Sequence, residues 1–317
     1  MTRMIKLYKE KEDIDMKKVG LFIFLTAFLF GTMEVALKLA GNGLDSFQLT
    51  FLRFIIGGIL LLPFALNEMK KNETRLGIKD LGYLLYLGII CIPVSMLFFQ
   101  LGVMHSNAST ASVIMCINPL FTMIFAHFMS DEQFNKKKLI VLMWGILGLI
   151  FMVRPWDIQE GNTPLGIIFM LIAAATFGLY TVAGKNSIQK MGIMAQTSIS
   201  FILGSFVLLM IMIGMNKPVL KGVGDNLVIV MYISIFVTGL GYYFYFSAIK
   251  NSDATTGSIA FFIKPAIAPV IAVIVLGDQL LWNTYVGIAL ILIASYLNIY
   301  NKKTEGKDIE QEQVEFE

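Results

Sequence analysis

The chain has 317 residues, of which 56% are hydrophobic and 15% are charged, with a mean hydropathy of +0.73 and a formal net charge of +3. A water-soluble domain of this length needs far more polar surface, so the composition excludes a soluble globular protein. The lysines and arginines are spread over many short segments and give no basic patch of the kind that binds nucleic acid.

Apolar runs of about 20 residues, the length that crosses a hydrocarbon core, recur along the whole chain. Because no water satisfies the backbone there, each run is predicted to be a helix. Ten are predicted, over residues 19–39, 47–66, 81–103, 107–129, 139–155, 164–185, 195–214, 226–249, 254–276 and 283–300. The fold class is therefore an all-α integral membrane protein, with a polar extension over 1–18 and a disordered tail over 302–317.

The chain begins like a signal peptide, with charged residues before an apolar run. No small-x-small cleavage site follows, so residues 19–39 are predicted to remain as the first helix. Met16 precedes Lys-Lys-Val-Gly and is a second candidate start, which would make residues 1–15 an extension.

The positive charges are distributed unevenly between the two sides of the membrane. With the N-terminus inside, 19 of the 25 lysines and arginines fall in inside segments, whereas three, Arg154, Lys217 and Lys221, fall in outside segments. The positive-inside rule then places both termini in the cytoplasm and requires an even number of helices. We expect a multi-pass protein of the cell membrane.

The two halves of the chain repeat each other. A shift of 147 residues places Phe30-Gly31 on Phe177-Gly178, and it also pairs Thr50 with Thr197, Phe54 with Phe201 and Gly57 with Gly204. Further along, a shift of 146 residues places Pro119 on Pro265. The repeats are predicted to cover 19–155 and 156–301, with five helices each. Since five is odd, the second copy enters from the opposite side, which makes the repeat inverted.

Inverted repeats are strongly associated with secondary transporters. Two interchangeable halves can exchange conformations, which gives inward-open and outward-open states of similar energy. The substrate site is then expected near the membrane midplane, between the halves.

On these motifs the chain resembles EamA-type members of the drug/metabolite transporter superfamily, over about residues 17–301. The resemblance depends on the two five-helix repeats, on Phe-Gly in each first helix, on Leu-Arg-Phe at 52–54, and on the proline and later acid of each fourth helix. It implies a ten-helix bundle that moves small polar metabolites, often exporting amino acids or related compounds. Phenylalanine rather than tryptophan before Gly31 and Gly178 departs from a common family pattern.

Four ionisable residues lie within the apolar runs, at a cost of roughly 2.5–3.5 kcal/mol each at a helix centre. Lys38 is in the last turn of its helix and Arg53 about two turns into its own, so both are expected to reach the outer interface as anchors. Glu34 lies on the same face as Lys38, one turn deeper. It is either a neutralised partner of a lysine or a protonatable acid that couples transport to protons.

Lys264 lies about 15 Å into its helix, close to the midplane. It must face a substrate or a counter-charge such as Glu34, whereas the other repeat has Asn118 at this position. Pro119, Pro265 and Pro269 free backbone carbonyls and are candidate helix breaks or hinges.

Aromatic side chains give a weaker signal. Tyr180 and Tyr243 are candidates for the lining of a site, because aromatic faces hold cationic or planar ligands. The candidate substrate-binding residues are therefore Lys264, Glu34, Asn118, Lys38, Tyr180 and Tyr243.

The predicted function is secondary active transport of a small polar metabolite, an amino acid or related zwitterion. The alternatives are a facilitator or translocator of nucleosides, quaternary amines or lipid headgroups, a channel, and a membrane enzyme. Cys91 and Cys116 fit no metal motif, and neither histidine has a metal-ligand partner at helical spacing. No cofactor and no metal are predicted, and the partners are a small-molecule substrate and lipid, with a monomer or homodimer both open.

Overall fold

The computed structural model describes residues 16–33, 36, 43–105, 114–130, 136–153 and 163–264, together with 267, 274, 282–283, 285–287, 289–290 and 293. Over these residues the protein is helical and contains no strand. The helices are Met16–Met33, α2 (Ser46–Lys71), α3 (Ile78–Ile89), η2 (Ile90–Met96), α4 (Leu97–Met104), α6 (Asn118–Met129), α7 (Lys136–Val153), α8 (Pro164–Met191), α9 (Ile193–Gly214), η4 (Gly224–Asn226), α10 (Leu227–Tyr232), η5 (Ile233–Leu240), α11 (Gly241–Lys250) and α12 (Ala254–Ser258).

Six described helices are long and apolar enough to cross a membrane. They are Met16–Met33, Ser46–Lys71, Ile78–Gly102, Pro164–Met191, Ile193–Gly214 and Gly224–Lys250. Each coincides with a predicted span, while α7 has a shorter apolar stretch at Leu139–Gly148. Much of the two predicted spans over 254–276 and 283–300 lies outside the described residues, so the count of ten stays a prediction.

Side chains cap the start of two of the long helices. Asp45 accepts a hydrogen bond from the N–H of Phe47 (2.9 Å) at the start of α2, and Thr163 accepts one from Gly166 (3.1 Å) at the start of α8. Gly192 separates α8 from α9 with φ +91°, a left-handed conformation that favours glycine. These local features set the starts of α2 and α8 and the boundary between α8 and α9.

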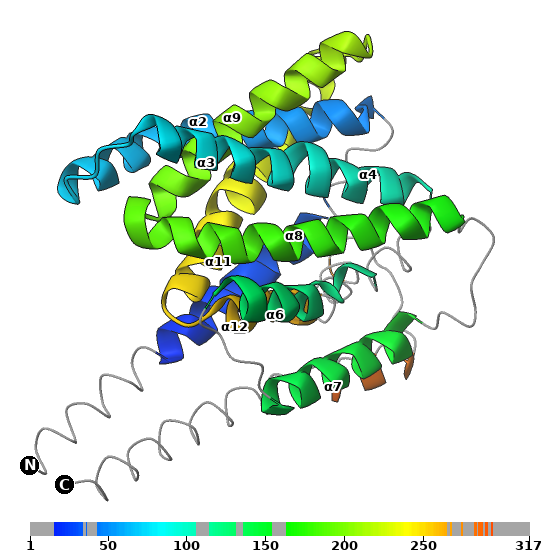
Figure 1. The fold of residues 1–317 in the computed structure, drawn as a ribbon. Helices are drawn as coiled ribbons and strands as arrows, with labels where there is room; N and C mark the ends of the chain where they lie inside the picture. Colours follow the sequence, from blue (N-terminus) through cyan, green and yellow to red (C-terminus); the bar gives the residue numbers. More distant parts are fainter. Residues whose placement is uncertain are drawn as a thin grey trace, which may run out of the picture.

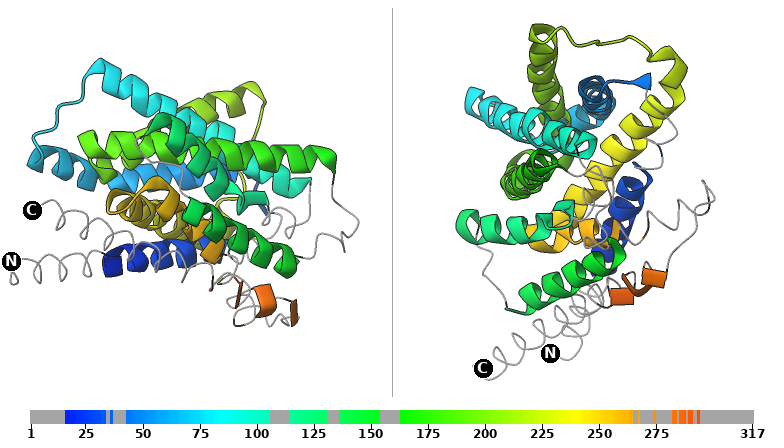
Figure 2. Two further views of the ribbon diagram at one scale, coloured as in Figure 1. Left: turned by 60° about the horizontal axis from the view of Figure 1, so that its bottom comes forward. Right: turned by 90° about the vertical axis from the view of Figure 1, so that its right-hand side faces the viewer.

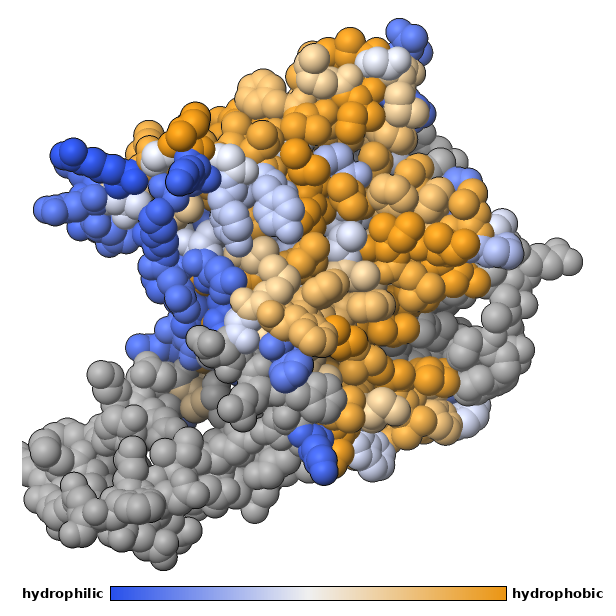
Figure 3. Space-filling model, viewed as in Figure 1, coloured by the Kyte–Doolittle hydropathy of each residue, from blue (hydrophilic) through white to orange (hydrophobic). Residues whose placement is uncertain are grey.

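α2 and α9 pack against each other, and this pair lies between η5 on one side and α3 on the other (Figure 1). α8 runs beside α4 and α6, and α7 lies at the edge of the bundle (Figures 1 and 2). Hydrophobic residues cover the broad face over α9, α4 and α8, whereas polar residues gather where α2 leads into α3 (Figure 3). This arrangement suits a bundle that meets lipid along its length and water at its ends.

Two close contacts between helix backbones occupy equivalent positions of the sequence repeat. A Cβ added to Gly57 of α2 would lie 3.0 Å from the Ser234 carbonyl of η5. A Cβ added to Gly204 of α9 would overlap the Gly88 carbonyl of α3. Gly57 and Gly204 are 147 positions apart, and Gly88 and Ser234 are 146 apart, so each half makes the same contact with the other.

Two continuous helical segments contain a π-helical section. Ile78–Met104 contains η2, and Gly224–Lys250 contains η5. Pro93 lies within η2 and cannot donate the backbone hydrogen bond of a regular helix. The described part of the fourth predicted span is also irregular, because a turn at 116–117 separates Ile114-Met115 from α6.

Candidate functional site

Nine aromatic rings form a cluster in the middle of the bundle, which we call the aromatic centre. They come from Met16–Met33, α2, α8, α9, α11 and the helical turn after α12. The members are Phe30, Phe54, Phe177, Tyr180, Phe201, Tyr242, Tyr245, Phe246 and Phe261, each at most 7% exposed. Both halves of the chain therefore contribute to one buried centre.

Tyr242 is the hub of the aromatic centre. Its ring lies 4.9 Å from Phe201, 5.3 Å from Phe30 and 5.7 Å from Phe54, between ring centroids. These three contacts are edge-to-face, which is a favoured arrangement of aromatic quadrupoles.

Residues that the sequence repeat pairs with each other meet in the aromatic centre. Phe54 and Phe201 contact ring to ring, at 4.7 Å and an interplanar angle of 88°. Phe30 and Phe177, which are also 147 positions apart, both contact Tyr242, Tyr245 and Phe261. Equivalent positions of the two halves therefore meet in the same cluster of rings.

The buried phenol groups of the centre have polar neighbours. Tyr245 Oη and Thr181 Oγ1 are 2.7 Å apart, and Tyr180 Oη accepts a longer hydrogen bond of 3.4 Å from Gln196. The Cys91 thiol lies 3.9 Å from Tyr242 Oη. The centre therefore places three hydroxyl groups among apolar rings, which is the composition of many small-molecule sites.

Arg53 of α2 is buried beside the aromatic centre, with 2% of the side chain exposed. Its guanidinium lies over the Phe54 ring (Cζ to centroid 4.6 Å), and Nη1 is 3.4 Å from Met33 Sδ. The prediction that Arg53 anchors at the outer interface is wrong. The position along the helix was within reach of the headgroups, but the side chain lies on the face of α2 that packs inward.

Asn118 is fully buried at the first turn of α6, where Pro119 follows it. Its side-chain Nδ2 donates a hydrogen bond of 2.9 Å to the carbonyl of Ala174 in α8. Thr122 donates to the Asn118 carbonyl at 3.1 Å. The Asn118 side chain therefore ties α6 to α8, directly after the break at 116–117.

Lys264 is half-buried and lies one helical turn beyond Phe261. The Phe261 ring contacts Phe177 at 5.1 Å and Phe30 at 5.8 Å, so Lys264 follows directly on a member of the aromatic centre. Glu34, Lys38, Pro265 and Pro269, the other predicted residues of this region, lie outside the described residues.

The two predicted tyrosines fall in different places. Tyr180 belongs to the aromatic centre, whereas Tyr243 is half-buried and packs against Phe244 at 5.4 Å. Sequence reasoning missed Tyr242 and Tyr245. Their spacing of three residues puts them on one helical face, and this was the signal that could have found them.

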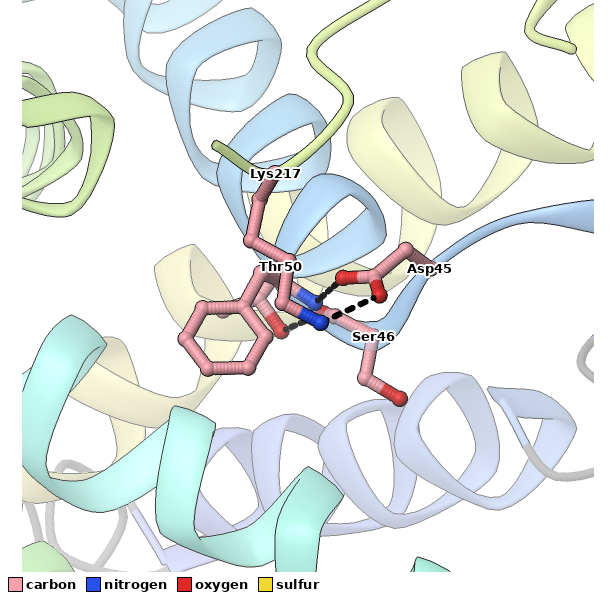
Figure 4. A network of polar contacts seen from close by, with 5 residues as sticks. Asp45, Ser46, Thr50 and Lys217 are labelled. Atoms are coloured by element: carbon pink, nitrogen blue, oxygen red, sulfur yellow. Dashed lines mark hydrogen bonds and ion pairs between the residues drawn. The ribbon is translucent and has the colours of Figure 1, made fainter. Parts of the chain in front are cut away.

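A polar clasp joins the start of α2 to the segment after α9 (Figure 4). Lys217 Nζ lies 3.0 Å from Asp45 Oδ2, while Asp45 Oδ1 caps the helix. Gln48, one turn into α2, donates to the carbonyls of Val219 (3.0 Å) and Lys221 (2.9 Å). We call this group the Asp45 clasp.

A second clasp holds the opposite end of the same helix pair. The Glu68 carboxylate of α2 accepts hydrogen bonds from the N–H groups of Ile193 (3.2 Å), Met194 (2.8 Å) and Ala195 (3.2 Å) at the start of α9. A carboxylate suits this position because a helix N-terminus carries a partial positive charge. Within the described residues, no cluster of histidine, cysteine, aspartate or glutamate could hold a metal ion.

Comparison with known protein families decides which of the possible membrane proteins this is. The model of the EamA-like transporter family matches residues 17–154 and again residues 164–300. The chain belongs to the EamA-like transporter family. It is therefore a multi-pass membrane transporter, as the sequence resemblance indicated.

Relatives of this EamA protein include other transporters. An uncharacterised transporter of Clostridium kluyveri is 36% identical over 93% of this chain and 97% of its own length. An S-adenosylmethionine uptake transporter of Rickettsia felis is 26% identical over 85% of this chain and 88% of its own. A protein of known crystal structure shares the fold at 18% identity, with a TM-score of 0.74 over 89% of this chain and 96% of that one.

Proposed function

We propose that this EamA protein is a secondary active transporter of an amino acid or related zwitterion, working by alternating access and exporting its substrate across the cell membrane. The observation that carries the proposal is the contact between residues paired by the repeat. Phe54 meets Phe201, and the contact of Gly57 with Ser234 is repeated by that of Gly204 with Gly88. A two-fold axis between inverted halves produces this pattern.

The proposed unit has ten helices in two inverted repeats, 19–155 and 156–301, with both termini in the cytoplasm. The separate family matches over 17–154 and 164–300 support this division. In such transporters the substrate site lies where the halves meet, near broken helices. Here that place is the aromatic centre, and the irregular start of α6 lies beside it through Asn118 and α8.

The proposed charges of the site are Lys264 and Glu34. Phe30 and Phe261 contact each other, and the two charged residues follow them by four and three positions on helices predicted to run in the same direction. Helical spacing then carries Glu34 and Lys264 to similar depths. We propose that Lys264 attracts the anionic group, and that Glu34 binds the ammonium group or carries a coupling proton.

The relatives support a zwitterionic substrate. The Rickettsia felis protein takes its name from S-adenosylmethionine, which combines an amino-acid zwitterion with a cationic sulfonium and a planar base. Aromatic faces bind cations and planar groups, and the aromatic centre supplies such faces. We propose the zwitterionic class for this chain and leave the individual compound to experiment.

The test is uptake and counterflow in proteoliposomes, with and without a proton gradient, using amino acids, S-adenosylmethionine, nucleosides and quaternary amines. We expect saturable flux of a zwitterion that Lys264→Gln reduces at least tenfold, and that loses its dependence on the proton gradient in Glu34→Gln. Lys250→Gln, which removes an exposed lysine at the end of α11, is the matched control.

Other outcomes would replace the proposal. Flux of nucleosides or quaternary amines alone would point to another solute class on the same fold. Single-channel currents or movement of lipid headgroups between leaflets would point to a channel or a lipid translocator.

A further inference from the structure

Gln196 lies in the first turn of α9 and is a fully buried carboxamide at the edge of the aromatic centre. Its Nε2 donates to Tyr180 Oη at 3.4 Å, and its Oε1 accepts from Thr197 Oγ1, also at 3.4 Å. Tyr180 belongs to the aromatic centre, with its ring 5.6 Å from Phe177 and 6.4 Å from Tyr242, between ring centroids. Gln196 therefore brings a neutral polar group to the buried rings.

Both side-chain hydrogen bonds of Gln196 are long, since such bonds usually measure roughly 2.7–3.2 Å. The buried carboxamides of Gln48 and Asn118 show the ordinary case, because they donate to backbone carbonyls at 2.9–3.0 Å. A carboxamide has two N–H groups and an oxygen with two lone pairs, so the contacts among the described residues use only part of what Gln196 offers. A buried polar group that is weakly paired costs free energy, and a ligand that pairs with it recovers that cost.

The packing of α9 does not depend on a glutamine at this position. The Glu68 carboxylate already holds the start of α9, through the N–H groups of residues 193–195. In the repeat, Gln196 corresponds to Leu49, a buried apolar residue of α2. The equivalent place in the first half is therefore filled without a hydrogen-bonding side chain, and the Gln196 carboxamide calls for another role.

Phe177 connects Gln196 with the proposed charges of the site. Its ring contacts Tyr180 at 5.6 Å and Phe261 at 5.1 Å, between ring centroids. Tyr180 is the neighbour of Gln196, and Lys264 lies one helical turn beyond Phe261. One small ligand beside Phe177 can therefore meet a charged group through one part and Gln196 through another.

We propose that Gln196, together with the Tyr180 hydroxyl, binds an uncharged polar group of the transported substrate, a hydroxyl or a carboxamide. The inference rests on the proposed function, and it narrows the zwitterion to an amino acid with a neutral polar side chain. A carboxamide and a phenol both donate and accept hydrogen bonds and carry no charge, so they match a group of the same kind. A charged side chain would instead need an opposite charge to offset its burial.

The experiment compares amino acids of similar shape that differ in one polar group. The full-length protein in proteoliposomes is given threonine against valine, and asparagine against leucine and aspartate, and counterflow of each is measured. We expect the wild type to prefer threonine and asparagine by about tenfold, because the other members leave a buried group unpaired or bury a charge. Gln196→Leu abolishes the preference over valine and leucine, and Tyr180→Phe, which keeps the ring but not the hydroxyl, lowers it.

Gln48→Leu is the matched control, because it also replaces a buried glutamine by the leucine found at position 49. The Gln48 side chain ties α2 to the carbonyls of Val219 and Lys221, so its loss lowers thermal stability in detergent and keeps the preference. A purely structural role of Gln196 would give this same result. If Gln196→Leu does not fold, the wild-type comparison and Tyr180→Phe decide.

Two results would overturn the inference and leave the proposed function intact. One is a wild type that carries valine, leucine or aspartate as well as the polar, uncharged member of the pair. The other is a Gln196→Leu protein, or a Tyr180→Phe protein where Gln196→Leu does not fold, that keeps the full preference. A protein that carries only nucleosides or quaternary amines would contradict the inference and the proposed function together.

Discussion

Gly88 and Gly204 determine how closely α3 approaches α9. A Cβ added to Gly88 would overlap the Ser200 carbonyl and lie 2.8 Å from the Gly204 backbone nitrogen. Both obstacles are backbone atoms of a helix, so no side-chain rotation can relieve the overlap. Since α9 also packs along α2, the fit at Gly88 affects the pairing of the two halves.

Gly88→Ala is therefore expected to destabilise the protein, although alanine is the better helix former. Overpacking of this kind costs about 1–3 kcal/mol, which exceeds the helix-propensity gain of about 1 kcal/mol. Thermal unfolding in detergent measures the difference. Gly82→Ala on the same helix is the control, because a Cβ there meets nothing within 4 Å, and it should be neutral or slightly stabilising. Equal effects of the two substitutions would contradict the packing argument.

The sequence indicated some residues of the buried interior, while their role in substrate binding stays a prediction. Tyr180 and Asn118 are in or beside the buried centre, and both were candidates from the sequence. Arg53 was assigned to the interface because depth along a helix can be counted, whereas the face it presents depends on its neighbours. Tyr243 was chosen over Tyr242 for the same reason, since one position along a helix turns the side chain by about 100°.

At the scale of elements, α2 and α9 are held at both ends. The Asp45 clasp joins the start of α2 to the segment after α9, and the Glu68 clasp joins the end of α2 to the start of α9. Lys217 and Asp45 are both about one third exposed or less, so their pair is a modest contribution of about 0–1 kcal/mol. Glu68 makes three hydrogen bonds to backbone groups that would otherwise lack helical partners, so its clasp is the stronger one.

Glu68→Ala is expected to lower the free energy of unfolding by about 1–3 kcal/mol, by the loss of a charge-assisted helix cap. Glu68→Gln, which can still accept a hydrogen bond, should lose less. Gly192→Ala provides the second arm, because its Cβ would collide with the Glu68 carboxylate and its φ of +91° disfavours alanine. In a double-mutant cycle, Gly192→Ala should lower the free energy of unfolding less in the Glu68→Ala background than in the wild type. Strict additivity would show that the carboxylate does not depend on that glycine.

The lengths of the hydrophobic runs predicted the bounds of the long helices closely. The runs 47–66, 164–185 and 195–214 became Ser46–Lys71, Pro164–Met191 and Ile193–Gly214. The extra turns at the ends of α2 and α8 are rich in polar residues, which hydropathy leaves out. The π-helical sections η2 and η5 were not predicted, because they depend on backbone hydrogen bonding inside a run that reads as uniformly apolar.

At the scale of the whole molecule, the central contacts join one half of the chain to the other. Phe54 of the first half meets Phe201 of the second, and α2 and α9 each contact the third helix of the opposite half. Among the described residues, each buried hydrophobic cluster draws on both halves of the chain. Relative motion of the halves would therefore reorganise the aromatic centre, which is where we propose that the substrate binds.

The proposed inverted arrangement makes a prediction about the two sides of the membrane. The segment after α2 and the segment after α9 occupy equivalent positions of the repeat, so inversion places them on opposite faces. Asn72 and Lys221 are exposed representatives of the two segments, and the native Cys91 and Cys116 are buried, which keeps background labelling low. We expect a membrane-impermeant maleimide to label Lys221→Cys in intact cells, and Asn72→Cys only after permeabilisation. If only Asn72→Cys were labelled in intact cells, the halves would be inverted but the protein would have the opposite orientation in the membrane. If both cysteines were labelled from the same side, the two halves would run parallel.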